Sequence, residues 1–75
     1  MTITITAGRW ATKYFNTAGV TLTLGASPTV LDAINALSIP PDEVGFATLN
    51  GTAIGKDYPL TEGLTINLHP TIVGG

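Results

Sequence analysis

Apolar and polar residues alternate along several short segments of the chain, and this alternation predicts β-strands. In residues 2–6 the apolar side chains of Ile3 and Ile5 share one face, while threonines occupy the other. A period of two is typical of a strand with one buried face. Residues 20–24 repeat the pattern, so the two segments are predicted to pair as a hairpin with a wide or irregular connection.

A different spacing follows, and it predicts one helix. Thr29 is a natural N-cap, and Asp32, three residues later, completes a short form of the capping box. Apolar residues then recur at helical spacing over residues 30–37. The helix is predicted to end at the segment Ile39-Pro40-Pro41, because a residue that precedes proline disfavours helical dihedral angles.

The chain after the helix predicts a second hairpin. Its first strand covers residues 45–49, and the alternation there places Phe46 on the outer face of the sheet. The dipeptide Asn50-Gly51 follows directly and favours a type I′ turn, because both central positions of that turn need a positive φ. Residues 52–54 are predicted to form the short returning strand.

The last strand is predicted at residues 64–69. Pro70 should stop it, because proline cannot donate a hydrogen bond to the ladder. The resulting order is ββαβββ, with one amphipathic helix covering one face of the sheet, and this defines a two-layer α+β domain. The domain is predicted to span residues 1–70, and residues 71–75 are predicted to be a flexible tail.

The sparse charge of the chain narrows its possible partners. Charged residues make up 11% of the sequence, and only three of them are basic. This is too few for the positive surface that nucleic acid or an anionic membrane requires. The chain also has no apolar stretch near the roughly 20 residues of a membrane span, and its start lacks the features of a signal peptide. We therefore expect a cytoplasmic protein that binds neither nucleic acid nor membrane.

The sequence contains few candidate catalytic residues. It contains no cysteine, so a thiolate metal site is excluded. His69 is the only histidine, and no acidic residue has ligand-like spacing beside it, so we interpret it as a residue at the solvent edge of the sheet. The acidic residues show no sign of a catalytic carboxylate pair. We predict no catalytic residue, no metal site and no enzyme activity of the chain's own.

Aromatic residues suggest two surfaces of interest. Trp10, Tyr14 and Phe15 cluster in the first connection, where they either cap one end of a small core or face a partner. Phe46 stands on a face composed mostly of threonines, which makes it a candidate residue for docking a partner. A register shift of one residue would instead turn Phe46 into the core.

The C-terminal segment Ile72-Val73-Gly74-Gly75 is the most informative part of the chain. Glycine has no Cβ, so a segment ending in two glycines can enter a narrow channel and approach another protein's catalytic groups closely. Glycine also leaves the Gly75 carboxylate unhindered for attack on a phosphorus atom of ATP. We predict that Gly75 is the reactive residue and that Ile72, Val73 and Gly74 insert into a partner enzyme.

These residues together resemble the ThiS/MoaD family of ubiquitin-like sulfur carriers. The similarity covers roughly residues 29–75 and, more loosely, the opening strand. It implies a β-grasp fold, in which one helix covers a mixed sheet. The segments that carry the resemblance are the helix start at residues 29–33, Ile39-Pro40-Pro41-Asp42-Glu43-Val44-Gly45, Leu49-Asn50-Gly51, Asp57-Tyr58-Pro59-Leu60, Glu62-Gly63 and the tail from Pro70 to Gly75.

The resemblance also implies a mechanism. A ubiquitin-activating-like adenylyltransferase would use ATP to join Gly75 to AMP, and a persulfide would then convert the adenylate to a thiocarboxylate. The chain itself would bind no cofactor. The sulfur would pass to thiazole synthase or to the large subunit of molybdopterin synthase, and the position of Pro70 favours the molybdopterin type. The alternatives are a ubiquitin-like modifier joined to lysines through Gly75, and a plain binding module whose glycine tail is incidental.

Overall fold

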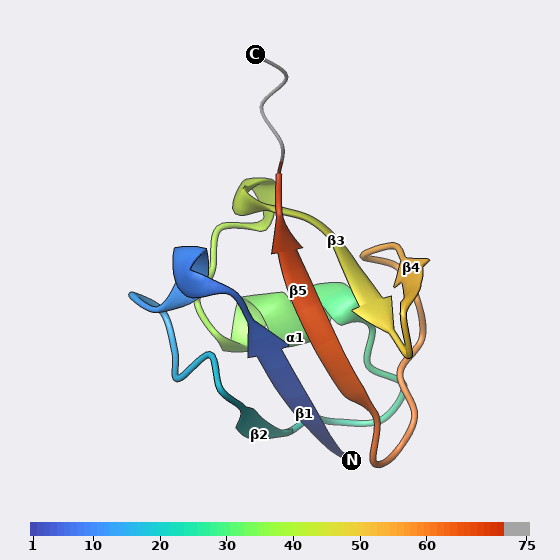
Figure 1. Cartoon of the computed structure of the whole chain (residues 1–75). Helices are drawn as coiled ribbons and strands as arrows, with labels where there is room; N and C mark the ends of the chain where they lie inside the picture. Colours follow the sequence, from blue (N-terminus) through green and yellow to red (C-terminus); the bar gives the residue numbers. More distant parts are fainter. Residues whose placement is uncertain (72–75) are drawn as a thin grey trace.

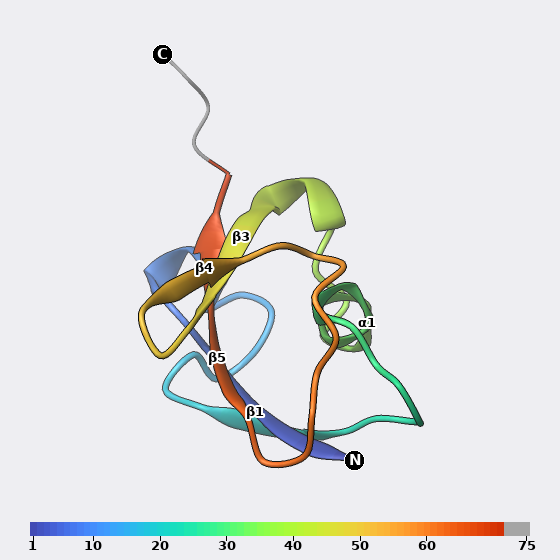
Figure 2. The same ribbon diagram turned by 90° about the vertical axis from the view of Figure 1, so that its right-hand side faces the viewer.

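A single α-helix lies across one face of a five-stranded sheet, and the other face is open (Figures 1 and 2). This computed structural model describes residues 1–71. Its elements are β1 (Thr2–Ala7), the 3₁₀ turn η1 (Arg9–Ala11), β2 (Val20–Thr23), α1 (Val30–Ala36), the 3₁₀ turn η2 (Pro41–Glu43), β3 (Val44–Leu49), β4 (Thr52–Ile54) and β5 (Thr65–Pro70).

The sheet has the strand order β2-β1-β5-β3-β4, which puts the last strand of the chain in the middle. Strands β1 and β5 pair in parallel, and the other neighbouring pairs are antiparallel. The predicted α+β domain is therefore confirmed, with its ββαβββ order, its mixed sheet and its one covering helix.

The predicted type I′ turn and the predicted helix cap are both present in the structure. Asn50 and Gly51 have φ values of 52° and 81°, so both central residues of the β3–β4 turn adopt the positive φ of a type I′ turn. The Thr29 backbone N–H donates to Asp32 Oδ2 at 2.7 Å, and the Asp32 N–H donates to Thr29 Oγ1 at 3.4 Å. This reciprocal pair is the predicted capping box.

The helix ends earlier than the prolines alone would require. Its last residue is Ala36, and Ser38 has a φ of 59° in the left-handed region. That conformation turns the chain before it reaches Pro40. A left-handed residue directly after a helix is a common way to satisfy the last carbonyl groups. The prediction that the Ile39-Pro40-Pro41 segment ends the helix was therefore late by about one turn.

The last strand runs one residue further than predicted. Pro70 belongs to β5, where it pairs with Val44, so the prediction that this proline stops the strand before position 70 was wrong. Proline lacks only the N–H group, and the end of a strand tolerates its absence. The ladder between β3 and β5 also contains an irregularity between Val44 and Phe46, with Gly45 between them.

The core lies between the sheet and α1. Strands β1 and β5 contribute Ile3, Ile5, Ile66 and Leu68, each at most 1% exposed. They pack against the apolar face of the helix in one cluster. Burial of such a side chain is worth about 1.5–3 kcal/mol, so this layer is the main source of stability.

The aromatic residues of the first connection pack against the edge of this core. Trp10, Tyr14 and Phe15 are half-buried and in contact with the core cluster. The interpretation that they cap one end of the core is therefore confirmed. Among residues 1–71, no helix is long and apolar enough to span a bilayer.

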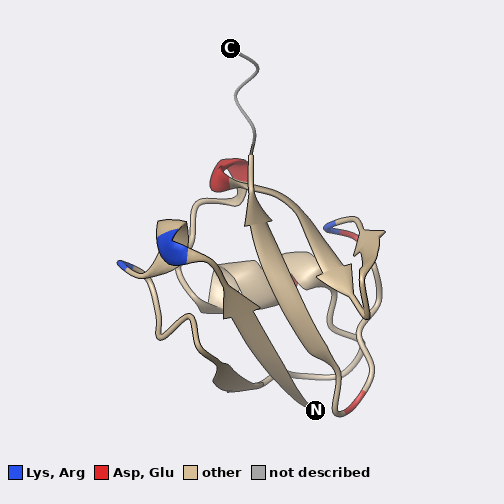
Figure 3. Ribbon diagram, in the orientation of Figure 1, with Lys and Arg blue, Asp and Glu red and all other residues tan. Residues whose placement is uncertain are grey.

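Charged side chains are confined to loops, turns and the helix. In the described part of the chain, no strand carries a lysine, arginine, aspartate or glutamate (Figure 3). The open face of the sheet therefore carries no lysine, arginine, aspartate or glutamate from its strands. Figure 3 also shows the acidic residues of η2 beside the upper end of β5, where the described chain ends.

Candidate functional site

The residues to which sequence analysis assigned the chemistry, Ile72, Val73, Gly74 and Gly75, lie outside the described residues. The structure does describe the place from which they continue. Strand β5 crosses the middle of the sheet and ends beside η2, and Thr71 follows it directly (Figure 1). We call the surroundings of Thr71 the tail root, formed by η2, Gly45, Pro70 and Thr71.

Thr71 is bound to η2 by two hydrogen bonds. Its hydroxyl Oγ1 donates to the backbone carbonyl of Asp42 at 2.6 Å. Its backbone N–H donates to the carbonyl of Glu43 at 3.0 Å. Both acceptors are backbone oxygen atoms, so their positions depend on the backbone conformation of η2 and not on its acidic side chains. The predicted boundary between a domain at 1–70 and a tail at 71–75 stays a prediction.

Gly45 allows the tail root to lie close to β3. A Cβ atom at this position would be 3.0 Å from the Pro70 carbonyl oxygen and 3.1 Å from Thr71 Cα. Both neighbours are backbone atoms, which cannot move away as the end of a side chain can. The absence of a side chain at Gly45 thus permits the observed approach of the two backbone segments.

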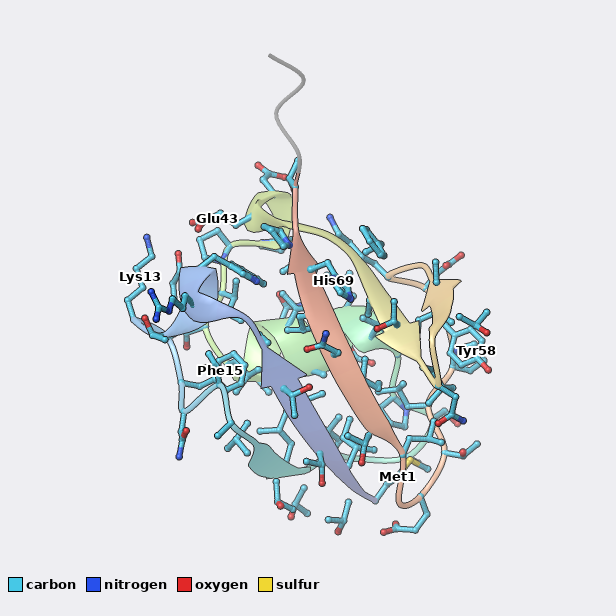
Figure 4. The ribbon with its side chains drawn as sticks, viewed as in Figure 1. Met1, Lys13, Phe15, Glu43, Tyr58 and His69 are labelled. Carbon is cyan, nitrogen blue, oxygen red and sulfur yellow. The ribbon has the colours of Figure 1, made fainter. Side chains whose placement is uncertain are left out.

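The connection between β1 and β2 contacts η2 through a side-chain hydrogen bond. The Tyr14 hydroxyl donates to Glu43 Oε2 at 2.6 Å. This hydrogen bond raises the pKa of Tyr14 above its usual value, and desolvation and the negative charge of Glu43 act in the same direction. Lys13 Nζ lies 5.2 Å from the centroid of the Tyr14 ring, within the range of a cation–π contact. Figure 4 shows Glu43 and Lys13 at this end of the molecule.

Phe46 lies where the alternation predicted, half-buried on the outer face of the sheet. Its ring stacks on that of its cross-strand partner His69, with centroids 4.6 Å apart and an angle of 10° between the ring planes. Figure 4 shows His69 on β5, in front of the sheet. The outward register of Phe46 is therefore confirmed. His69 shares this outer face, but it is half-buried on the central strand β5 and so does not lie at the solvent edge of the sheet. Docking of a partner at Phe46 stays a prediction.

Polar side chains link three strands across this outer face. His69 Nε2 lies 3.0 Å from Thr48 Oγ1 on β3 and 3.4 Å from Asn67 Nδ2 on its own strand. Asn67 Oδ1 in turn accepts a hydrogen bond of 2.9 Å from Thr6 Oγ1 on β1. This network could not be predicted from the sequence, because its members become neighbours only when the strands pair. The alternation of Asn67 and His69 on one face was its only visible signal.

Two further observations concern the described region as a whole. Within residues 1–71, no group of three histidine, aspartate or glutamate side chains stands close enough to hold a metal ion. No pocket opens in the same part of the chain. The candidate functional regions among residues 1–71 are therefore the tail root and the outer face of the sheet.

Comparison with known proteins supplies the context for this geometry. Residues 15–73 match the family model described as Mut7-C ubiquitin. The structure resembles that of SAMP1 from Haloferax volcanii, with a TM-score of 0.73, 19% sequence identity and full coverage of both chains. It also resembles a putative molybdopterin converting factor, subunit 1, from Pyrococcus furiosus, with a TM-score of 0.73, 14% identity and coverage of 95% of this chain and 98% of that one. A search of curated proteins found no match.

At these identities the likeness to the two solved structures shows the fold, which is the ubiquitin-like β-grasp. The predicted fold class is confirmed. The resemblance to ubiquitin-like proteins of the ThiS/MoaD kind is confirmed as well, because the family model and both structures point to the same class.

Proposed function

Because the chain belongs to the Mut7-C ubiquitin family, we propose that it is a ubiquitin-like sulfur carrier whose working group is the carboxylate of Gly75. One observation carries this proposal. Strand β5 leads through the middle of the sheet to Thr71, and the glycine pair Gly74-Gly75 follows within four residues. A rigid domain would thus present a short segment ending in an unhindered carboxylate.

The chemistry is supplied by a separate adenylyltransferase that uses ATP. A Gly75 carboxylate oxygen attacks the α-phosphorus of ATP, the bond to the leaving pyrophosphate breaks, and an acyl adenylate forms. The terminal sulfur of a protein persulfide then displaces AMP, which gives an acyl disulfide. A second thiol reduces this disulfide, and the thiocarboxylate stays on Gly75. The carrier binds no cofactor, and Ile72, Val73 and Gly74 hold the reacting end in the partner.

We favour molybdopterin synthesis over thiazole synthesis as the destination of the sulfur. Support comes from the structural likeness to a putative molybdopterin converting factor subunit and from the position of Pro70, five residues before Gly75. The recipient is then the large subunit of molybdopterin synthase, in the cytoplasm. Complementation of strains that lack each carrier tests this choice, and rescue of the thiazole strain alone would overturn it.

Intact mass spectrometry tests the proposed function itself. The purified chain is incubated with ATP and a ubiquitin-activating-like adenylyltransferase, first alone and then with a persulfide donor and a thiol. We expect an AMP adduct in the first reaction and the replacement of one oxygen by sulfur in the second. The same spectra show whether the chain ends at Gly75. A chain that receives neither group contradicts the proposal.

The same experiment separates the second candidate, a ubiquitin-like modifier joined to lysines through Gly75. The description of the matching family as a ubiquitin favours this candidate. A modifier yields branched conjugates in which Gly75 is linked to a lysine amine, while a sulfur carrier yields a free thiocarboxylate. Peptide mapping of the products after proteolysis distinguishes the two kinds of bond.

A further inference from the structure

We propose that Thr71 is a positioning residue, whose hydroxyl clamps the chain onto η2 and so fixes the point at which the reactive tail begins. We call this arrangement the Thr71 clamp; it consists of Thr71, the carbonyls of Asp42 and Glu43, and Gly45. The inference rests on the proposed function, because it concerns how the Gly75 carboxylate is presented to the adenylyltransferase. It assigns a role to a residue whose side chain, within residues 1–71, hydrogen-bonds to the backbone of its own chain.

The contacts of Thr71 are those of an anchor and not of a core residue. The side chain is exposed, and its hydroxyl nevertheless donates a short hydrogen bond of 2.6 Å to the Asp42 carbonyl. The backbone N–H of the same residue donates to the next carbonyl, that of Glu43, at 3.0 Å. Two bonds from one residue to consecutive carbonyls fix both the position and the direction of the chain as it leaves β5.

Gly45 and Tyr14 help to position the backbone around Thr71 and its acceptors. Gly45 lets β3 approach the backbone of Pro70 and Thr71, where a Cβ atom would lie within 3.1 Å of Thr71 Cα. The Tyr14 hydroxyl holds Glu43 through a hydrogen bond of 2.6 Å that spans 29 positions of sequence. The carbonyls that receive Thr71 therefore belong to a segment tied to the rest of the domain.

The clamp limits how far Gly75 can extend from the tail root. Gly75 lies four positions after Thr71, and four fully extended residues span at most about 14 Å. The adenylation site must therefore lie within this distance of the tail root, so the end of the domain around η2 must face the partner's active site. Each residue freed from the clamp would add about 3.5 Å of chain and further conformations to be ordered. Misplacement of a reacting group by about 1 Å already costs roughly a hundredfold in rate.

A matched pair of variants tests the clamp. Thr71→Val removes the hydroxyl and keeps the branched shape, while Thr71→Ser keeps the hydroxyl. With the adenylyltransferase and ATP, we expect Thr71→Val to lower kcat for adenylation about two- to tenfold, the range of one hydrogen bond, with KM for the chain unchanged. Thr71→Ser should behave like wild type. Equal kcat values for all three chains overturn the inference, and so does an increase in KM alone, because the hydroxyl would then contact the partner.

A measurement without the enzyme separates the clamp from the proposed function. The backbone order parameter at position 71, from ¹⁵N relaxation, should be near 0.85 in wild type and in Thr71→Ser, and should fall towards 0.6 in Thr71→Val. A wild-type value already below 0.6 overturns the clamp, whatever the kinetics show. If the wild-type chain is not adenylated at all, the proposed function fails, and the order parameter alone decides whether the clamp exists. Unchanged melting of Thr71→Val verifies that the domain stays folded.

Discussion

Phe46 lies half-buried on the open face of the sheet, where its ring stacks on His69. We expect Phe46→Ala to weaken binding of the adenylyltransferase by about 2 kcal/mol or more, as an aromatic anchor does. Loss of the stack should lower the free energy of unfolding by no more than about 1 kcal/mol. Isothermal titration and urea denaturation measure the two quantities.

Thr21→Ala is the control for Phe46→Ala, because Thr21 is exposed on β2 at the edge of the sheet. It should change neither quantity. If Phe46→Ala instead lowers the free energy of unfolding by about 3 kcal/mol or more, as truncation of a core aromatic residue does, Phe46 is a core residue and no docking role follows. Unchanged affinity would remove the outer face from the interface.

Tyr14 gives a prediction that depends on pH. Its hydrogen bond to Glu43 raises its pKa in the folded state, so the folded chain holds the phenolic proton more tightly than the unfolded chain does. The stability from this bond is present below the unfolded value of about 10 and is lost as the pH rises through the higher folded value. Urea denaturation should therefore show a decline in wild-type stability in this range that is reduced in Tyr14→Phe. Identical profiles would contradict the hydrogen bond.

At the scale of elements, the sequence predicts most of the fold because each strand buries one face. The alternation around Ile5 and Phe46 therefore leaves a readable pattern. The parallel pairing of β1 with β5 leaves none, because it depends on how distant segments come together, and it was expected only through the resemblance. The left-handed Ser38 and the hydrogen bonds of Thr71 were missed for a similar reason: both depend on the path of the surrounding chain.

The capping box of α1 is the element-scale feature that is easiest to test. The helix has seven residues, which is too short to be stable alone, so its ends matter. We expect Thr29→Ala to lower the free energy of unfolding by about 1 kcal/mol. Thr29→Ser keeps the acceptor for the Asp32 N–H and should cost much less. Urea denaturation of both variants is the measurement, and an equal loss in both would show that the cap contributes through packing alone.

At the scale of the whole molecule, the fold and the proposed chemistry occupy separate parts of the chain. The buried core cluster of the described region begins at Ile3 and ends at Leu68, well before Gly75. The side chains of the outer face and the tail root are not part of this core cluster. Substitutions there should therefore leave the packing of the core intact. The proposed docking of a partner on the sheet therefore does not require any element of the described region to unfold.

Removal of Gly75 tests this separation most directly. Since the core ends at Leu68, the shortened chain should keep the circular dichroism spectrum and melting temperature of the wild type. Adenylation should nevertheless collapse, because the new terminal carboxylate stops about 3.5 Å short, and reacting groups must be placed to within about 1 Å. An additional residue after Gly75 should be equally harmful. Intact mass spectrometry of the AMP adduct provides the readout; a shortened chain that is adenylated at the wild-type rate would show that Gly75 is not the reactive residue.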